Sequence, residues 1–67
     1  MKFHEKLCEL RLEQGMTQKQ VAEQLGVSTS CYGGYEQGYR EPDFKTLIKI
    51  CRYFHISSDE LLGVNEP

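Results

Sequence analysis

Histidine and cysteine carry the most versatile side-chain chemistry in this sequence, and one such pair has a spacing that metal ions use. His4 and Cys8 are four residues apart, so on a helix they would share one face. Zinc needs three or four protein ligands, and these two residues supply only two. His55 and the other cysteines have no ligand spacing. We therefore expect a surface histidine and a packed thiol, with no bound metal and no other cofactor.

The three cysteines, Cys8, Cys31 and Cys51, include no C-x-x-C pair and cannot complete a disulfide framework. We therefore expect a reduced protein of the cytoplasm. Oxidation of Cys31 could act as a switch. No basic residue lies near it in the sequence to activate it as a thiolate, however, so a structural thiol is the simpler interpretation.

Length and composition exclude several classes of protein. A chain of 67 residues forms one domain. It is too short for a sizeable catalytic pocket and has no catalytic motif, so we expect no enzyme and no small-molecule ligand. No apolar run approaches the ~20 residues of a membrane span, and charged residues run through the first ten, so we expect no membrane partner. The net charge of −2 does not indicate a nucleic-acid partner, so any such site must be local.

Helix punctuation organises the whole chain, and no segment alternates as a strand would. Phe3, Leu7 and Leu10 predict a helix over about residues 3–14, which Gly15 stops. Capping residues and glycines then delimit four more helices. They are expected over about residues 17–25, 28–37, 43–54 and 57–62. We therefore predict an all-α fold of five helices.

The second and third of these helices are each about eight residues long, and a three-residue turn with Gly26 joins them. These lengths are typical of a helix-turn-helix unit. On a helical wheel of residues 28–37, Cys31, Tyr32 and Tyr35 fall on one side. The other side bears Thr29, Ser30, Gly33 and Gln37.

From about Leu7 to Gly63 the chain resembles the Cro and phage-repressor family, also called XRE-like or lambda-repressor-like helix-turn-helix domains. The matching stretches, in order, are LRLEQGMTQKQVAEQLGVS, YEQGYREPD, LIKICRYFHIS and SDELLG. The resemblance implies a compact five-helix domain over residues 1–67. It also implies a homodimer that binds double-stranded DNA and regulates transcription, as a repressor in our interpretation, with its third helix in the major groove.

The resemblance also implies roles for individual residues. Base contacts would come from Thr29, Ser30 and Gly34. Contacts to the DNA backbone would come from Gln18, Lys19, Gln37, Tyr39 and Arg40. A structural salt bridge would join Arg11 to Glu36. The helix-turn-helix segment itself would be built on Thr17, Gln18, Ala22, Gly26, Val27, Ser28, Tyr32 and Tyr35.

The third helix departs from the family pattern. Residues 28–38 contain no Lys, Arg or Asn, so the usual bidentate readers of bases are missing. Gly33 and Gly34 cost about 1 kcal/mol each relative to Ala in a helix, and they either let the helix approach DNA closely or mark a frayed helix. Glu41 and Asp43 put acid where the family often has phosphate-binding bases.

These departures keep alternatives open. The chain could be a protein-interaction module, or an antitoxin-like protein with a protein partner, that keeps the fold with weak or lost DNA specificity. Because the chain ends shortly after Gly63, we expect regulation by abundance, dimerisation or a partner rather than by a ligand domain. For the dimer interface, the apolar residues of the last segment are the candidates: Phe54, Ile56, Leu61, Leu62 and Val64.

Overall fold

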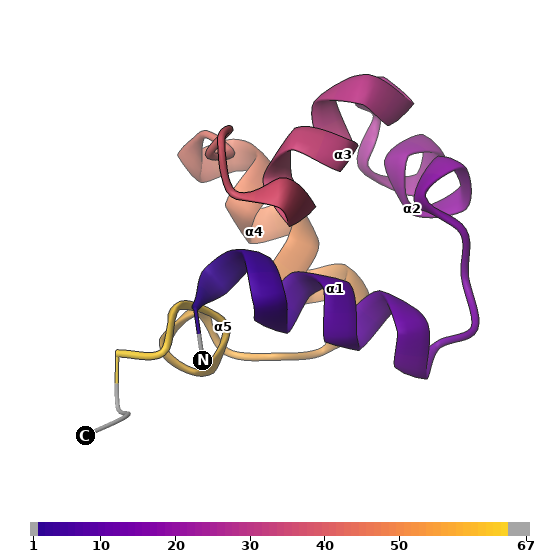
Figure 1. Cartoon of the computed structure of the whole chain (residues 1–67). Helices are drawn as coiled ribbons and strands as arrows, with labels where there is room; N and C mark the ends of the chain where they lie inside the picture. Colours follow the sequence, from indigo (N-terminus) through magenta and orange to yellow (C-terminus); the bar gives the residue numbers. More distant parts are fainter. Residues whose placement is uncertain (1, 65–67) are drawn as a thin grey trace.

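The computed structural model describes residues 2–64 and contains the five expected helices (Figure 1). They are α1 (Phe3–Glu13), α2 (Gln18–Leu25), α3 (Thr29–Gln37), α4 (Phe44–Phe54) and α5 (Ser58–Leu62). No strand occurs within residues 2–64, and the predicted all-α class is confirmed. The helix boundaries lie within one residue of those that the sequence predicts.

Side-chain caps explain why α2 to α5 begin where they do. The Thr17 hydroxyl accepts from the Gln20 backbone N–H over 3.1 Å, and the Gln20 side chain accepts in return from the Thr17 N–H over 2.9 Å. This reciprocal capping box satisfies two backbone groups that a helix start otherwise leaves without partners. A single side-chain oxygen caps each of the other three helices: that of Ser28 caps α3, that of Asp43 caps α4 and that of Ser57 caps α5.

One buried cluster draws residues from all five helices. Its members, each less than a tenth exposed, are Leu7, Val21, Ala22, Leu25, Tyr32, Tyr35, Ile50, Phe54 and Leu61. In Figure 1, α3 lies above α1 and beside α2, and α5 lies close to the start of α1. The core therefore fixes α3 from two sides, through its contacts with α1 and α2.

The turn between α2 and α3 depends on Gly26. This residue adopts a left-handed conformation with φ of 75°, which costs glycine little and other residues more. The next N–H, that of Val27, donates to the Ala22 carbonyl over 3.1 Å and closes the end of α2. Ala22 itself is fully buried, so its small side chain lets α3 pack closely.

Two residues expected at a dimer interface are part of this core instead. Leu61 is fully buried and Phe54 is 8% exposed, so neither side chain is accessible to a partner. The sequence shows that both residues are apolar, but it does not show whether the domain's own core or a partner covers them. Leu62 and Val64, in contrast, are exposed.

None of the helices in the described part of the chain combines the length and apolar character needed to span a membrane.

Candidate nucleic-acid interface

The first turn of α3 presents two hydroxyl groups at the surface. The Ser28 side chain caps the helix by accepting from the Cys31 N–H over 3.0 Å, which leaves Thr29 and Ser30 in the first turn. Both residues are exposed. A hydroxyl can donate and accept hydrogen bonds, so this turn can meet either kind of group on a base edge.

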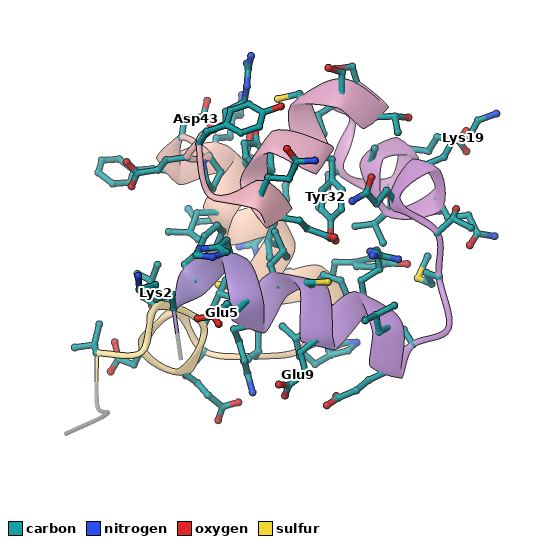
Figure 2. The ribbon with its side chains drawn as sticks, in the orientation of Figure 1. Lys2, Glu5, Glu9, Lys19, Tyr32 and Asp43 are labelled. Atoms are coloured by element: carbon teal, nitrogen blue, oxygen red, sulfur yellow. The ribbon has the colours of Figure 1, made fainter. Side chains whose placement is uncertain are left out.

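Two tyrosines hold the opposite side of α3 in the core. Tyr32 is fully buried and Tyr35 is 5% exposed, and their rings meet edge to face with centroids 6.2 Å apart. Figure 2 shows Tyr32 pointing from α3 toward α1. Burial, together with the hydrogen bond that its hydroxyl shares with Cys31, raises the pKa of Tyr35 to about 12. These anchors set the rotation of α3, and so they determine that Thr29 and Ser30 face outward.

Arg11 of α1 and Glu36 of α3 form a bidentate ion pair. Arg11 Nε lies 2.6 Å from Glu36 Oε2, and Nη2 lies 3.1 Å from Oε1. The Arg11 side chain is 13% exposed and that of Glu36 only 4%. Arg11 Nη1 also donates to the Met16 carbonyl over 2.8 Å. The pair therefore ties α3 to α1 and to the loop before α2.

The ion pair shifts the titration of its members and of a buried neighbour. Burial alone would raise the pKa of Glu36, but hydrogen bonds from Arg11 and Gln18 outweigh it and lower that pKa below 4.5. The Tyr32 hydroxyl is buried beside this carboxylate and has no well-formed hydrogen bond among the described residues. Burial, and then the negative charge, raise the pKa of Tyr32 well above its ordinary value. Glu36 is therefore ionised and Tyr32 neutral at neutral pH.

Gln18 begins α2 and lies between that helix and α3. Its Nε2 donates to Glu36 Oε1 over 3.0 Å, and its side chain is partly exposed. The first N–H groups of a helix have no partners within the helix, so the start of α2 offers donors to an anion. Lys19, the next residue, is exposed and adds a positive charge.

The two glycines of α3 are buried, including Gly34, which the resemblance placed among the base contacts. A Cβ at Gly33 would lie 3.6 Å from Gln18 Oε1, so the Gln18 side chain covers this glycine. A Cβ at Gly34 would lie 3.0 Å from both Arg40 Cβ and Tyr39 Cε2. Since the loop after α3 covers Gly34, we leave this residue out of the base-contacting set. The sequence could not show that residues 39 and 40 fold back on the helix.

The remaining residues expected at the DNA backbone are all exposed: Lys19, Gln37, Tyr39 and Arg40. Tyr39 is 69% exposed although it covers Gly34. Arg40 Nη1 lies 4.0 Å from Cys31 Sγ. No basic residue lies near Cys31 in the sequence, but the loop after α3 folds back and brings Arg40, nine residues later, next to it.

Three acidic residues lie along α1. Glu5, Glu9 and Glu13 recur at every fourth position of α1. Figure 2 shows Glu5 and Glu9 pointing away from α3, while Lys19 and Asp43 lie on either side of α3. Acidic residues therefore occur both on α1 and beside α3, where Asp43 caps α4.

Among the described residues, no group of three or more His, Cys, Asp or Glu side chains is placed to hold a metal ion. The His4 ring instead packs against Gly38, where a Cβ would lie 3.1 Å from Nδ1. Cys8 Sγ lies 3.9 Å from Arg11 Nη2. His4 therefore supports the packing of α1 against the end of α3, whereas Cys8 contacts Arg11 within α1.

Comparison with known proteins places this arrangement in a family. A family model described as helix-turn-helix matches residues 9–61. The chain is 39% identical over 66 residues to the HTH-type transcriptional regulator ImmR of Bacillus subtilis, covering 98% of this chain and 52% of that relative. The chain thus spans about half the length of this relative.

Solved structures are similar over nearly all of the fold. A transcriptional regulator from Listeria innocua matches with a TM-score of 0.88 and 42% identity, over 92% of this chain and 58% of that one. The P22 c2 repressor, solved in complex with a synthetic operator, matches with a TM-score of 0.87 and 22% identity, over 92% of this chain and 94% of that one. The capped α2–turn–α3 unit, its buried anchors and these matches together show that the chain belongs to the helix-turn-helix family of Cro- and phage-repressor-like, or XRE-like, domains.

Proposed function

We propose that this domain binds double-stranded DNA in the cytoplasm and regulates transcription, with α3 in the major groove. The observation that carries the proposal is the first turn of α3, which is rigidly anchored on one side and presents Thr29 and Ser30 on the other. The major groove admits an α-helix, and the N-terminal residues of such a helix reach the base edges.

In this proposal the start of α2 holds the DNA backbone. Gln18 and Lys19 supply an amide, a cation and free backbone N–H groups, all suited to a phosphate. Gln37 and Tyr39, which lie at the end of α3 and just after it, contact the backbone on the other flank. These groups position α3 on the duplex but carry no sequence information, because phosphates are the same at every base pair.

Similar proteins support a regulatory role rather than an enzymatic one. The relative ImmR is named as a transcriptional regulator, and the P22 c2 repressor was solved with an operator. Binding that covers promoter DNA represses transcription, so we propose a repressor. Residues 1–67 act in this proposal as a single DNA-binding domain.

We further propose that the domain binds DNA as a homodimer. One helix reads only a few base pairs, and a twofold dimer doubles the site with half-sites about 34 Å apart. With Leu61 and Phe54 in the core, the interface must use exposed apolar residues. Leu62, Val64, Phe44 and Ile48 are all exposed, and Phe44, which is 86% exposed, lines a hollow with Leu47, Ile48 and Cys51.

DNA retardation at several salt concentrations tests the proposal. We expect binding to fragments that flank the protein's own coding sequence, with affinity that falls as salt rises. The slope should be shallow, because few cations are available to displace counterions. Lys19→Gln should lower the slope of log affinity against log salt concentration by roughly 0.9, the contribution of one phosphate contact.

Lys6→Gln is the matched control, since it removes the same charge from α1, where Lys6 pairs with Glu9 over 3.5 Å. It should leave the slope unchanged. If no fragment is retarded at low salt, the protein-interaction module or antitoxin-like protein becomes the better interpretation, and the uncharged surface of α3 is the feature that favours it.

A further inference from the structure

The helix proposed to read DNA lacks a strong reading group of its own. The charged residue within Thr29–Gln37 is Glu36, which is buried in its ion pair with Arg11. Thr29 and Ser30 make short contacts of low selectivity. A bidentate donor, which distinguishes guanine best, must therefore come from another segment.

The loop after α3 folds back on the helix at Gly34. The Gly34 carbonyl accepts hydrogen bonds from the Gly38 N–H over 3.0 Å and from the Arg40 N–H over 3.3 Å. The absence of a side chain at Gly34 makes room for this approach, because a Cβ there would lie 3.0 Å from Arg40 Cβ. The Arg40 side chain therefore begins directly over the second turn of α3.

From that point the Arg40 side chain runs back toward the start of α3. Its Nη1 lies 4.0 Å from Sγ of Cys31, which precedes Gly34 by three residues, or about 4.5 Å along the helix axis. Ser30 precedes Gly34 by four residues and so shares its face of the helix. No carboxylate among the described residues forms an ion pair with Arg40. The guanidinium thus lies beside the first turn, where Nη1 donates to Cys31 Sγ, and its other N–H groups make no hydrogen bond among the described residues.

We propose that Arg40 reads a guanine next to the base pair contacted by Ser30, supplying from the loop the bidentate donor that α3 lacks. The inference rests on the function proposed above and changes the role of Arg40 from a backbone contact to a specificity-determining residue. The planar fork of a guanidinium matches the O6 and N7 acceptors of guanine in the major groove. Gly34 has a positioning role, because it admits the loop that carries Arg40.

The test begins with the duplexes that the wild-type protein selects from a random pool. Affinities are then measured for the preferred duplex and for each single base-pair substitution. For wild type we expect one G·C pair whose replacement lowers affinity about tenfold or more. Arg40→Lys keeps the charge but loses the fork, so this discrimination should fall to about twofold while the salt slope stays the same.

Lys6→Gln is the control, because Lys6 pairs with Glu9 on α1, away from the α3 loop and from the hollow at Phe44, and it should leave the discrimination unchanged. A second pair of variants tests the role of Gly34. Gly34→Ala should displace the exposed Arg40 and Tyr39 and abolish the same discrimination in a folded domain. Gly33→Ala adds the same methyl group at an ordinary contact distance of 3.6 Å from Gln18 Oε1 and should preserve it.

The outcomes separate this inference from the proposed function. If Arg40→Lys leaves the discrimination intact, or weakens all duplexes equally, Arg40 is a backbone contact and the inference is wrong, although DNA binding stands. If the wild-type protein selects no duplex and binds none at low salt, the proposed function fails and this inference fails with it.

Discussion

Gln18 Nε2 donates a hydrogen bond to Glu36 Oε1 over 3.0 Å, and the same carboxylate is bound by Arg11. The residue proposed to hold the DNA backbone is therefore fixed by the buried ion pair of the fold. A side chain held in this way loses less conformational freedom when it binds a ligand. The pair thus links the packing of α1 and α3 to the geometry of the DNA-binding surface.

Replacing Gln18 tests this link. Gln18→Ala removes one donor to Glu36, but the carboxylate keeps Arg11, so we expect unfolding to become easier by only about 1.5 kcal/mol. DNA affinity should fall about tenfold or less, and by the same factor for every sequence, since phosphates carry no sequence information. Fluorescence anisotropy measures the loss of affinity for specific and for random duplexes, and urea unfolding measures the loss of stability. Gln24→Ala, an exposed position of the same helix, should change neither. A selective loss at the specific site would contradict a backbone role.

Arg11→Ala should be far more damaging. It leaves the carboxylate of Glu36, with 4% exposure, without its cation, and breaking a buried pair in this way costs about 3–5 kcal/mol. That is comparable with the whole stability of a small domain, so thermal melting should show a protein that is largely unfolded.

Two further variants separate the loss of the pair from the loss of an arginine. Arg52→Ala removes an exposed arginine and should melt near the wild-type temperature. Arg11→Met combined with Glu36→Met replaces both charges with apolar groups, and this double variant should be more stable than Arg11→Ala alone. A double variant that is less stable would show that the carboxylate has other essential partners.

The lowered pKa of Glu36 predicts a dependence of stability on pH. The folded state favours the ionised carboxylate more than the unfolded chain does, so its stabilisation is complete above the ordinary pKa of 4.5. The stabilisation is lost as the pH falls through that value to the lower pKa of the folded state. Urea unfolding from about pH 6 to about pH 3 measures the free energy of unfolding of wild type and of Glu36→Gln. The difference between the two free energies should shrink as the pH falls. Glu23 is exposed, so the difference in unfolding free energy between wild type and Glu23→Gln should stay constant over the same pH range.

The sequence predicts the helices well because their signals are local. Thr17, Ser28 and Ser57 cap helices within three residues of themselves, and Gly26 ends one by its own backbone conformation. Each signal therefore acts regardless of how the helices later pack. The outward position of Thr29 and Ser30 follows from the same local periodicity, since Tyr32 and Tyr35 must be buried on the other side.

Contacts between distant segments were not predictable in the same way. Gly33 falls on the polar side of the helical wheel and Gly34 was expected at a base contact, yet Gln18 covers Gly33 and the loop at Tyr39 covers Gly34. Leu61 and Leu62 are adjacent and equally apolar, but only Leu62 is exposed. Which residues are covered depends on how helices and loops pack, and composition and spacing do not encode that directly.

The proposed dimer interface predicts a loss of assembly without a loss of fold. Phe44 is 86% exposed, so Phe44→Ser should leave the melting temperature nearly unchanged. If its ring is buried between two copies, the variant should be monomeric in sedimentation and should bind a two-half-site operator more weakly. Leu12→Ser is the control, because Leu12 on α1 is 62% exposed and lies outside the proposed interface. A wild-type protein that is monomeric both free and on DNA would rule out the dimer.

Readout by the first turn of α3 is the remaining prediction. Ser30→Ala should weaken the preferred duplex modestly and relax its preference at one base pair, on the low side of the ~1–3 kcal/mol of a bidentate contact. Its exposed hydroxyl makes no hydrogen bond within the described residues, so the fold should be unaffected. Thr29→Ala should act similarly at a neighbouring pair. The measurement is the affinity for every single base-pair substitution of the selected duplex. If the double variant Thr29→Ala, Ser30→Ala keeps the wild-type preference at every position, α3 only positions the protein, and the positions other than the guanine assigned to Arg40 are read through DNA shape.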